Sequence, residues 1–449
     1  MVPVLMGISN LSPIPLPMPT SPPATAHPTE DETEYLRWGA ESEFFRPDYS
    51  RSLTAIAPAL LSLLGRPVEG AADLSAFLPG GSPRRASRVL LLCIDGLGFK
   101  ELALAARLPA LHREWGTWVT SVFPSITSSA ITSMYLGLPP SRHGILGHRV
   151  WKDLPGGIVD MLRMQVVGAK LPLAAAGFEV NGWKREPGVM DGPHADGLTG
   201  IQLMPAAIVG SGLSAYCYGN TQLLGFLEPM EGFAKAAHLL SDMRNGWVGM
   251  YLSTVDSLTH ALGSDIEPVQ LALRHIEDGL TWMASRLPTH VLEDTALMVV
   301  ADHGQSPVRR TVPLEGAAWE WLEAHTRAIG FSGRVMHVYL GPQDQGQEAE
   351  AAARLEALMG DLGEVLTYDQ ARGLVGPEPD GSPGDAEWVR QTLGDLVAVL
   401  RGEVNWDKRR PGDLPFPYGN PLQSHHGAMS RDEMFVPLIL APLSALRGA

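Results

Sequence analysis

Five short segments carry the residue types from which a metal site can be built. Together they offer three carboxylates, three or four imidazoles and one hydroxyl, and they are residues 93–96, 123–127, 256–260, 301–304 and 424–427. Carboxylate oxygen and imidazole nitrogen bind zinc, manganese and magnesium. Two such ions about 4 Å apart can clamp an in-line displacement at phosphorus. The residue types therefore predict two divalent metal ions around an activated threonine.

Thr127 is the candidate nucleophile. Residues 128–138 are predicted as a helix, so Thr127 stands near a helix N-terminus, where free N–H groups and the helix dipole favour an anion. A threonine hydroxyl attacks poorly unless a base or a metal activates it. A threonine at a helix start is more often a simple cap. On this residue alone the cap stays the alternative, and the other segments favour the nucleophile.

The remaining candidates are aspartates and histidines that follow apolar runs. Asp256 and His260 stand four residues apart, so both side chains point to one side if the chain turns helical there. Asp302 and His303 precede a glycine whose sharp turn can direct both toward one ion. Asp95 directly follows an apolar run, and there a helix cap and a metal ligand are equally reasonable interpretations.

The elements that must position these residues alternate between strands and helices. Predicted strands cover 89–94, 117–123, 178–183, 213–218, 248–254, 295–301, 335–340, 396–401 and 434–440, and predicted helices include 231–244, 268–287 and 348–359. This alternation indicates an α/β fold with a doubly wound, mostly parallel sheet flanked by helices. Ligands gather at the carboxyl ends of strands in such sheets. The segments after strands should therefore converge.

The chain has 449 residues, enough for one large domain with additions. Residues 1–30 are rich in proline and predicted to be disordered. Residues 31–87 are predicted as a helical N-terminal extension and linker. The catalytic domain is expected over 88–449, with a smaller lobe within about 306–425.

Composition excludes some classes of partner. The net charge is −15, from 34 basic and 49 acidic residues, which argues against a stable nucleic-acid complex. Bound metal ions can still reverse the field locally for a phosphate substrate. The sequence contains no apolar run long enough to span a membrane. We expect no membrane partner and a cytoplasmic location, with export left open, while the oligomeric state is not indicated.

Taken together, the segments resemble the type I phosphodiesterase/nucleotide pyrophosphatase family of the alkaline phosphatase superfamily. Residues 123–145 follow the family's nucleophile segment without a gap, and 256–260, 301–304 and 426–427 fall in family order. The resemblance spans about 88–440. It implies an alkaline-phosphatase-like fold and hydrolysis of a small phosphate ester or nucleotide-like substrate through a phospho-threonine.

The resemblance also implies how the ligands divide between two ions. One ion would be bound by Asp95, Thr127, Asp302 and His303. The other would be bound by Asp256, His260 and His426. For the neighbouring His425 two interpretations stay open: it either contacts the ligands without binding metal or faces solvent. Zinc is the expected metal, with manganese or magnesium as alternatives.

One departure from the family bears on the substrate. The family usually has an asparagine, which helps to hold the phosphate, where this chain has His148. His148 can still donate a hydrogen bond, and Arg149 and Lys152 nearby would favour the extra charge of a monoester. The alternatives to a phosphodiesterase are therefore a phosphomonoesterase or a phosphonate hydrolase on the same scaffold. A binding-only protein ranks below both, because all the ligand positions hold competent residues.

Overall fold

The computed structural model describes residues 28–38, 43–79, 85–192, 195–264, 266–377, 383–407 and 422–447. Most of the predicted disordered tail, residues 1–27, lies outside the described residues. Within the described ranges, no helix is long and apolar enough to cross a membrane.

The centre of the fold is a seven-stranded sheet with the order β2-β18-β9-β1-β8-β6-β7. Its strands are β1 (Arg88–Ile94), β2 (Gly116–Thr120), β6 (Thr199–Pro205), β7 (Gln222–Phe226), β8 (Gly246–Leu252), β9 (Thr295–Val300) and β18 (Phe435–Pro442). Strand β1 is parallel to β8 and β9, and β6 is parallel to β7 and β8. Only β18 runs against its neighbours in this sheet. The predicted mostly parallel α/β sheet is confirmed.

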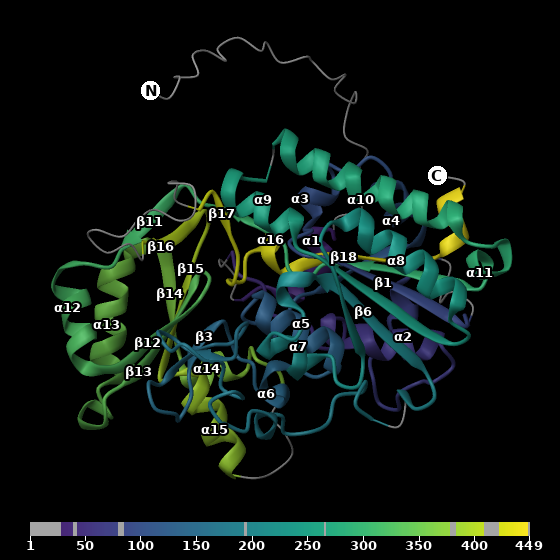
Figure 1. The fold of residues 1–449 in the computed structure, drawn as a ribbon. Coiled ribbons are helices and arrows are strands. Elements are labelled where there is room, and N and C mark those ends of the chain that lie inside the picture. Colours follow the sequence, from purple (N-terminus) through teal and green to yellow (C-terminus); the bar gives the residue numbers. More distant parts are fainter. Residues whose placement is uncertain are drawn as a thin grey trace, which may run out of the picture.

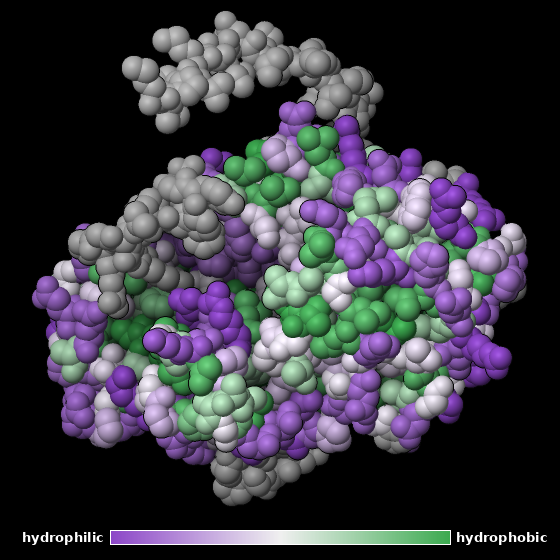
Figure 2. Space-filling model, viewed as in Figure 1, coloured by the Kyte–Doolittle hydropathy of each residue, from purple (hydrophilic) through white to green (hydrophobic). Residues whose placement is uncertain are grey.

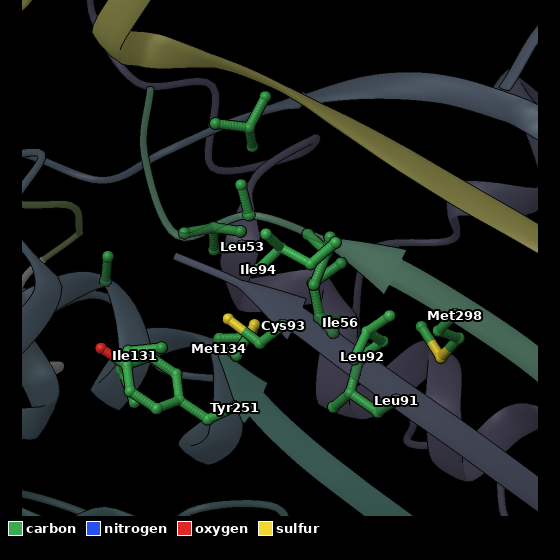
Figure 3. Close-up of a cluster of buried hydrophobic side chains, with 14 of the residues drawn as sticks. Leu53, Ile56, Leu91, Leu92, Cys93, Ile94, Ile131, Met134, Tyr251 and Met298 are labelled. Atoms are coloured by element: carbon green, nitrogen blue, oxygen red, sulfur yellow. The ribbon is translucent and has the colours of Figure 1, made fainter. Parts of the chain in front are cut away.

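Helices cover both faces of this sheet, which explains why β1 is apolar along nearly its whole length. The main helices are α2 (Ile56–Leu63), α4 (Leu108–Trp115), α5 (Thr127–Leu136), α7 (Gly212–Cys217), α8 (Pro229–Asp242), α9 (Thr254–Leu262) and α10 (Glu267–Arg286). Helices α8 and α10 pack together on one face, and α2 and α5 pack on the other (Figure 1). Figure 3 shows part of the core, where Leu53 and Ile56 lie beside side chains of β1 and α5.

A second seven-stranded sheet has the order β14-β15-β13-β12-β3-β4-β5. Its strands are β3 (Arg149–Trp151), β4 (Ile158–Asp160), β5 (Gln165–Val166), β12 (Thr326–Ser332), β13 (Val335–Leu340), β14 (Gly363–Thr367) and β15 (Leu396–Leu400). Helices α12 (Gly316–His325) and α13 (Glu348–Met359) pack together beside it. The lobe within 306–425 stays a prediction, and the second sheet also takes strands from 149–166.

Two of the predicted strands are wrong. Residues 213–217 lie in helix α7, whose start is capped by the Ser211 side chain, and Tyr218 directly follows its end. Residues 178–183 contain only a short 3₁₀ turn, Asn181–Trp183. A short apolar run does not distinguish a strand from a buried turn of helix, and in α7 the run packs against α5.

Candidate metal centre

Three of the aspartates come together because their strands are parallel neighbours. Asp95 follows β1, Asp256 lies in the first turn of α9 just after β8, and Asp302 follows β9. The carboxyl ends of these strands share one end of the sheet. Gly96 has a φ of +73°, and a Cβ at this position would lie only 3.1 Å from the Cα of Asp256. A glycine therefore lets the two chain segments approach closely.

Thr127 and His426 reach the same place by different routes. Thr127 is the first residue of α5, which follows β2. His426 precedes β18, and because β18 is antiparallel to β9, its starting end lies beside the carboxyl end of β9. The backbone N–H of Ser125 donates a hydrogen bond to the carbonyl of Gly427 at 3.3 Å. This bond ties the nucleophile segment to the His426 segment.

One group of side chains surrounds the Nε2 atom of His303. This nitrogen lies 3.1 Å from the Thr127 hydroxyl oxygen, 3.2 Å from Asp302 Oδ2 and 3.5 Å from Asp95 Oδ1. Asp95 Oδ1 and Asp302 Oδ2 are buried and have no hydrogen-bond partner among the described residues. Buried carboxylate oxygens without partners are costly. Their placement fits a site that receives a cation.

A second group is centred on Asp256 Oδ1. The Nε2 atoms of His260 and His426 lie 3.2 Å and 3.5 Å from this oxygen. The side-chain amide of Gln305 also donates a hydrogen bond to it at 2.6 Å. The two groups adjoin each other, since the rings of His303 and His426 stack with centroids 3.5 Å apart.

The three imidazoles are held in one tautomer. In each, Nδ1–H donates to a backbone carbonyl, so Nε2 is the nitrogen that can bind a cation. The acceptors are the carbonyls of Gly304 for His303 at 3.1 Å, Ser424 for His260 at 2.8 Å, and Ser125 for His426 at 3.0 Å. All three Nε2 atoms face the carboxylates, as metal-binding histidines do.

Burial and mutual repulsion perturb the acidic groups. Burial, followed by the nearby Asp302 and Asp256, raises the pKa of Asp95 well above its usual range. Burial also raises the pKa of Asp302. Burial alone would raise the pKa of Asp256, but His260 and His303 outweigh it and the pKa is lowered. A divalent cation would relieve this repulsion, because it favours the ionised form of each carboxyl group.

The imidazoles are perturbed as well. Burial, and then the neighbouring imidazoles, lowers the pKa of His426 well below its usual range. His426 is therefore neutral and able to ligate. The ring centroid of His425 lies 5.0 Å from that of His260, and nitrogens of His260, His425 and His426 lie within 4.8 Å of one another. His425 thus stands beside the predicted ligands.

A cavity of about 540 Å³ opens beside these groups, and Asp95, Thr127 and Asp256 form part of its wall. His148 and Arg149 line the same cavity, and the binding of substrate by His148 stays a prediction. Figure 2 shows a recess left of centre, walled by hydrophilic and hydrophobic residues. The expectation that Lys152 acts at the site is wrong. Its ammonium group is buried and donates to the Gly144 carbonyl and the Thr392 hydroxyl.

Two residues beside the centre were not found from the sequence. The Tyr251 hydroxyl donates a hydrogen bond to Asp95 Oδ2, and the Gln305 side-chain amide donates to Asp256 Oδ1. Gln305 directly follows the segment 301–304, and this position next to two predicted ligands could have identified it from the sequence. Tyr251 gives no such signal, because a tyrosine in an apolar strand is usually read as part of the core.

Comparison with known proteins supports one family. A family model described as type I phosphodiesterase/nucleotide pyrophosphatase matches residues 89–164 and 223–424, which is more than half of the chain. A comparison with curated proteins found no match.

Many solved structures share the fold, including the following three. An inactive murine ectonucleotide pyrophosphatase/phosphodiesterase 5 in complex with AMP has a TM-score of 0.55 at 13% identity, covering 78% of this chain and 87% of that one. The human protein of the same name has a TM-score of 0.57 at 16% identity, covering 79% and 87%. Phosphonoacetate hydrolase from Sinorhizobium meliloti, in complex with phosphonoformate, has a TM-score of 0.56 at 16% identity, covering 80% and 93%.

The family match follows the candidate centre along the chain. It covers the segments with Asp95, Thr127, Asp256, Asp302 and His303 and ends two residues before His426. The chain belongs to the type I phosphodiesterase/nucleotide pyrophosphatase family, a family of hydrolases that act on phosphodiester or pyrophosphate bonds.

Proposed function

We propose that the chain is a metal-dependent phosphodiesterase or nucleotide pyrophosphatase in which Thr127 is the nucleophile. The observation that carries this proposal is the position of the Thr127 hydroxyl, 3.1 Å from His303 Nε2, a nitrogen that also lies near the buried oxygens Asp95 Oδ1 and Asp302 Oδ2, which have no hydrogen-bond partner among the described residues. A threonine that only capped its helix would need no such surroundings, and the Thr127 side chain makes no capping hydrogen bond to a backbone N–H among the described residues.

The residues at the centre fit two divalent ions. Asp95, Asp302 and His303 offer three ligand atoms within 4.8 Å of one another, with the Thr127 hydroxyl beside them. Asp256, His260 and His426 would hold the second ion. A donor set of oxygen and nitrogen without thiolate suits zinc, with manganese or magnesium as alternatives. When bound, two such ions would supply Lewis-acid polarisation of the phosphoryl oxygens and of the attacking oxygen.

The protein residues then account for the transfer of the phosphoryl group. Thr127 Oγ1 releases its proton to solvent and attacks phosphorus, forming an O–P bond while the leaving oxygen departs with the electron pair of the broken P–O bond. Backbone N–H groups at the start of α5 can hold a phosphoryl oxygen, because they have no partner within the helix. Water next attacks the phosphorus and breaks the O–P bond to Thr127, which restores the hydroxyl for another turnover.

The cavity supports a small substrate. Its volume of about 540 Å³ lies within the range typical of small-molecule sites. The murine relative was solved with AMP, which supports a nucleotide-like group in this chain as well. The similarity to phosphonoacetate hydrolase, together with His148 in the cavity wall, keeps a phosphomonoesterase or phosphonate hydrolase as the second candidate.

Hydrolysis of bis-p-nitrophenyl phosphate beside p-nitrophenyl phosphate, with added zinc or manganese, tests the proposal. Thr127→Ala should lower the kcat for the diester by roughly 10³-fold or more, while circular dichroism and bound metal show an intact fold. Thr132→Ala is a matched control, because Thr132 lies on the same helix and its hydroxyl donates only to the Ser128 carbonyl. Full diesterase activity in Thr127→Ala would refute the covalent mechanism.

A further inference from the structure

The wall of the active-site cavity carries a cluster of charged residues around one carboxylate. Asp160 ends β4 and is buried. Its Oδ2 atom lies 3.4 Å from Arg163 Nη1, 3.7 Å from Arg149 Nε and 3.9 Å from His148 Nε2. The backbone N–H of Arg163 also donates to Oδ1 at 3.2 Å. One carboxylate thus holds two guanidinium groups and an imidazole.

This cluster has a surplus of positive charge. A guanidinium group stays protonated in proteins, so Arg149 and Arg163 bring two positive charges against the single negative charge of Asp160. The two arginine–aspartate pairs are loose, with separations of 3.4 and 3.7 Å. The side chains of Arg149 and Arg163 are 48% and 71% exposed. Both guanidinium groups can therefore take a further anionic partner.

The cluster faces the reaction site. Arg149 and Arg163 line the same cavity as Thr127. Arg163 also lines an adjoining hollow of about 740 Å³, bounded by residues 172–181 and 210–216. Arg163 therefore stands where the active-site cavity meets a second space large enough for part of a substrate.

Apolar side chains line the same cavity, and they include Ile131, Leu162, Ile208, Leu213 and Tyr218. Such a surface suits the organic group of an ester, because removing apolar area from water is favourable. The cavity therefore combines the predicted nucleophile, an apolar wall and a cationic cluster. Each matches a different part of one substrate.

We propose that the site selects phosphoric esters whose organic group carries a second negative charge, and that Arg149 and Arg163 bind this charge. This inference rests on the proposed function. The shared chemistry of the ligand is an anionic oxygen group, either a carboxylate or a second phosphoryl group. Arg149 and Arg163 act here as specificity-determining residues, and Asp160 positions them.

A matched set of synthetic esters tests the proposal. 4-Nitrophenyl phenyl phosphate and 4-nitrophenyl 4-carboxyphenyl phosphate release the same nitrophenolate and differ by one carboxylate. The metal-loaded protein should hydrolyse the carboxylate ester with a kcat/KM about fivefold higher, as expected for an anion held by half-exposed cations. A third ester carries a phosphonate in place of the carboxylate. Comparing its kcat/KM with that of the carboxylate ester shows whether the site prefers a carboxylate or a phosphoryl group. Salt should reduce the preference.

Two variants should lower the preference for the charged ester, and a third should raise it. Arg163→Gln and Arg149→Gln should each lower the ratio of kcat/KM for the charged ester over the neutral one. Asp160→Asn should raise this ratio, since the asparagine oxygen can still accept from the Arg163 N–H while the competing charge is gone. Arg309→Gln is the control. Arg309 is 74% exposed and pairs with Glu403 at 3.4 Å, the same separation as in the pair of Arg163 with Asp160. Unlike Arg163, Arg309 does not line the cavity.

The outcomes separate this inference from the proposed function. Hydrolysis of both esters with the same ratio in the wild type, Arg163→Gln and Arg149→Gln would overturn the inference and leave the proposed function standing. If neither ester is hydrolysed, the proposed function fails, and calorimetry with phenylphosphonate and 4-carboxyphenylphosphonate decides the inference. Equal dissociation constants for the two phosphonates would then overturn it, and tighter binding of the carboxylate form, lost in Arg163→Gln, would support it.

Discussion

At the scale of single residues, the candidate centre is already arranged for metal binding. Each of three imidazoles has its Nδ1–H on a backbone carbonyl and its Nε2 turned toward a carboxylate. Ligands fixed in this way need little rearrangement when an ion binds. The buried oxygens of Asp95 and Asp302 without partners complete this arrangement. The free energy that these groups cost without a cation is available to stabilise a bound one.

His148 is the residue whose replacement should change the choice of substrate. It lines the cavity with Thr127 and faces Asp160. His148→Asn restores the residue usual in the family and should raise the ratio of diester to monoester kcat/KM severalfold, because the imidazole can carry a positive charge that favours a monoester dianion. The ratio is measured with bis-p-nitrophenyl phosphate and p-nitrophenyl phosphate.

The surface residue His290, on α11 (Thr289–Glu293), provides the control as His290→Asn. An unchanged ratio in His148→Asn would remove His148 from the determinants of specificity.

The sequence was sufficient to predict which side chains converge, but not every direction in which they point. Asp95, Asp256 and Asp302 follow parallel strands, which bring such residues together whatever the rest of the fold does. Lys152 is close to His148 in sequence, yet its ammonium group lies over the rings of Trp183 and Trp388 instead. The direction of that side chain depends on packing against α15 (Pro383–Leu393), which lies far away along the chain.

At the scale of elements, the second sheet supports the site through the turn between β12 and β13. The Ser332 hydroxyl accepts a hydrogen bond from the His148 N–H at 2.9 Å, and the Arg334 N–H donates to the His426 carbonyl at 3.1 Å. Gly333 has a φ of +62°, and a Cβ there would lie 1.9 Å from the His426 carbonyl oxygen. The fully buried pair Arg334–Glu433, at 2.6 Å, anchors this turn.

Lys152 joins the end of β3 to α15 and to the Gly144 carbonyl after α6 (Pro140–His143). Burial, and then Arg185, lowers its pKa from the ordinary 10.5 to about 7. Between these values the unfolded chain holds a proton that the folded chain lacks, so this group makes the unfolding free energy rise with pH. Lys152→Met should remove that contribution, which amounts to as much as about 1.4 kcal/mol per pH unit.

Urea unfolding at pH 6.5, 8 and 9.5 checks this expectation. The stability of Lys152→Met relative to the wild type should fall as the pH rises. Lys235→Met, at a half-exposed position paired with Glu231, should show no such trend. A difference between Lys152→Met and the wild type that is constant with pH would contradict the proposed titration.

The strands with continuous apolar sequence were predicted well, and those without it were missed. Strands β1, β9 and β13 are uninterrupted apolar runs or nearly so, and such runs are typical of strands covered on both faces. Strand β6 contains a glycine and a glutamine, and the hairpin β3–β4 has only three residues in each strand. Tertiary pairing rather than local sequence determines these elements.

At the scale of the whole molecule, the protein is acidic, but its active-site cavity contains positively charged groups. The net charge is −15, yet the cavity combines a centre suited to cations with the guanidinium groups of Arg149 and Arg163. An anionic substrate would be attracted locally in spite of the overall charge.

The segment before the first strand of the main sheet is part of the fold, since Phe44, Leu53 and Ile56 are buried in the core. A cytoplasmic location stays a prediction.

Rapid acid quenching during turnover, followed by peptide mass spectrometry, tests the covalent mechanism most directly. Zinc- or manganese-loaded protein would be mixed with bis-p-nitrophenyl phosphate and quenched over a series of times, from before the first turnover to steady state. Attack by Thr127 predicts a p-nitrophenyl-phosphoryl group on Thr127 at early times, and no such group in Thr127→Ala. A burst of one nitrophenolate per chain with an unmodified Thr127, or with the adduct on another residue, would contradict the mechanism.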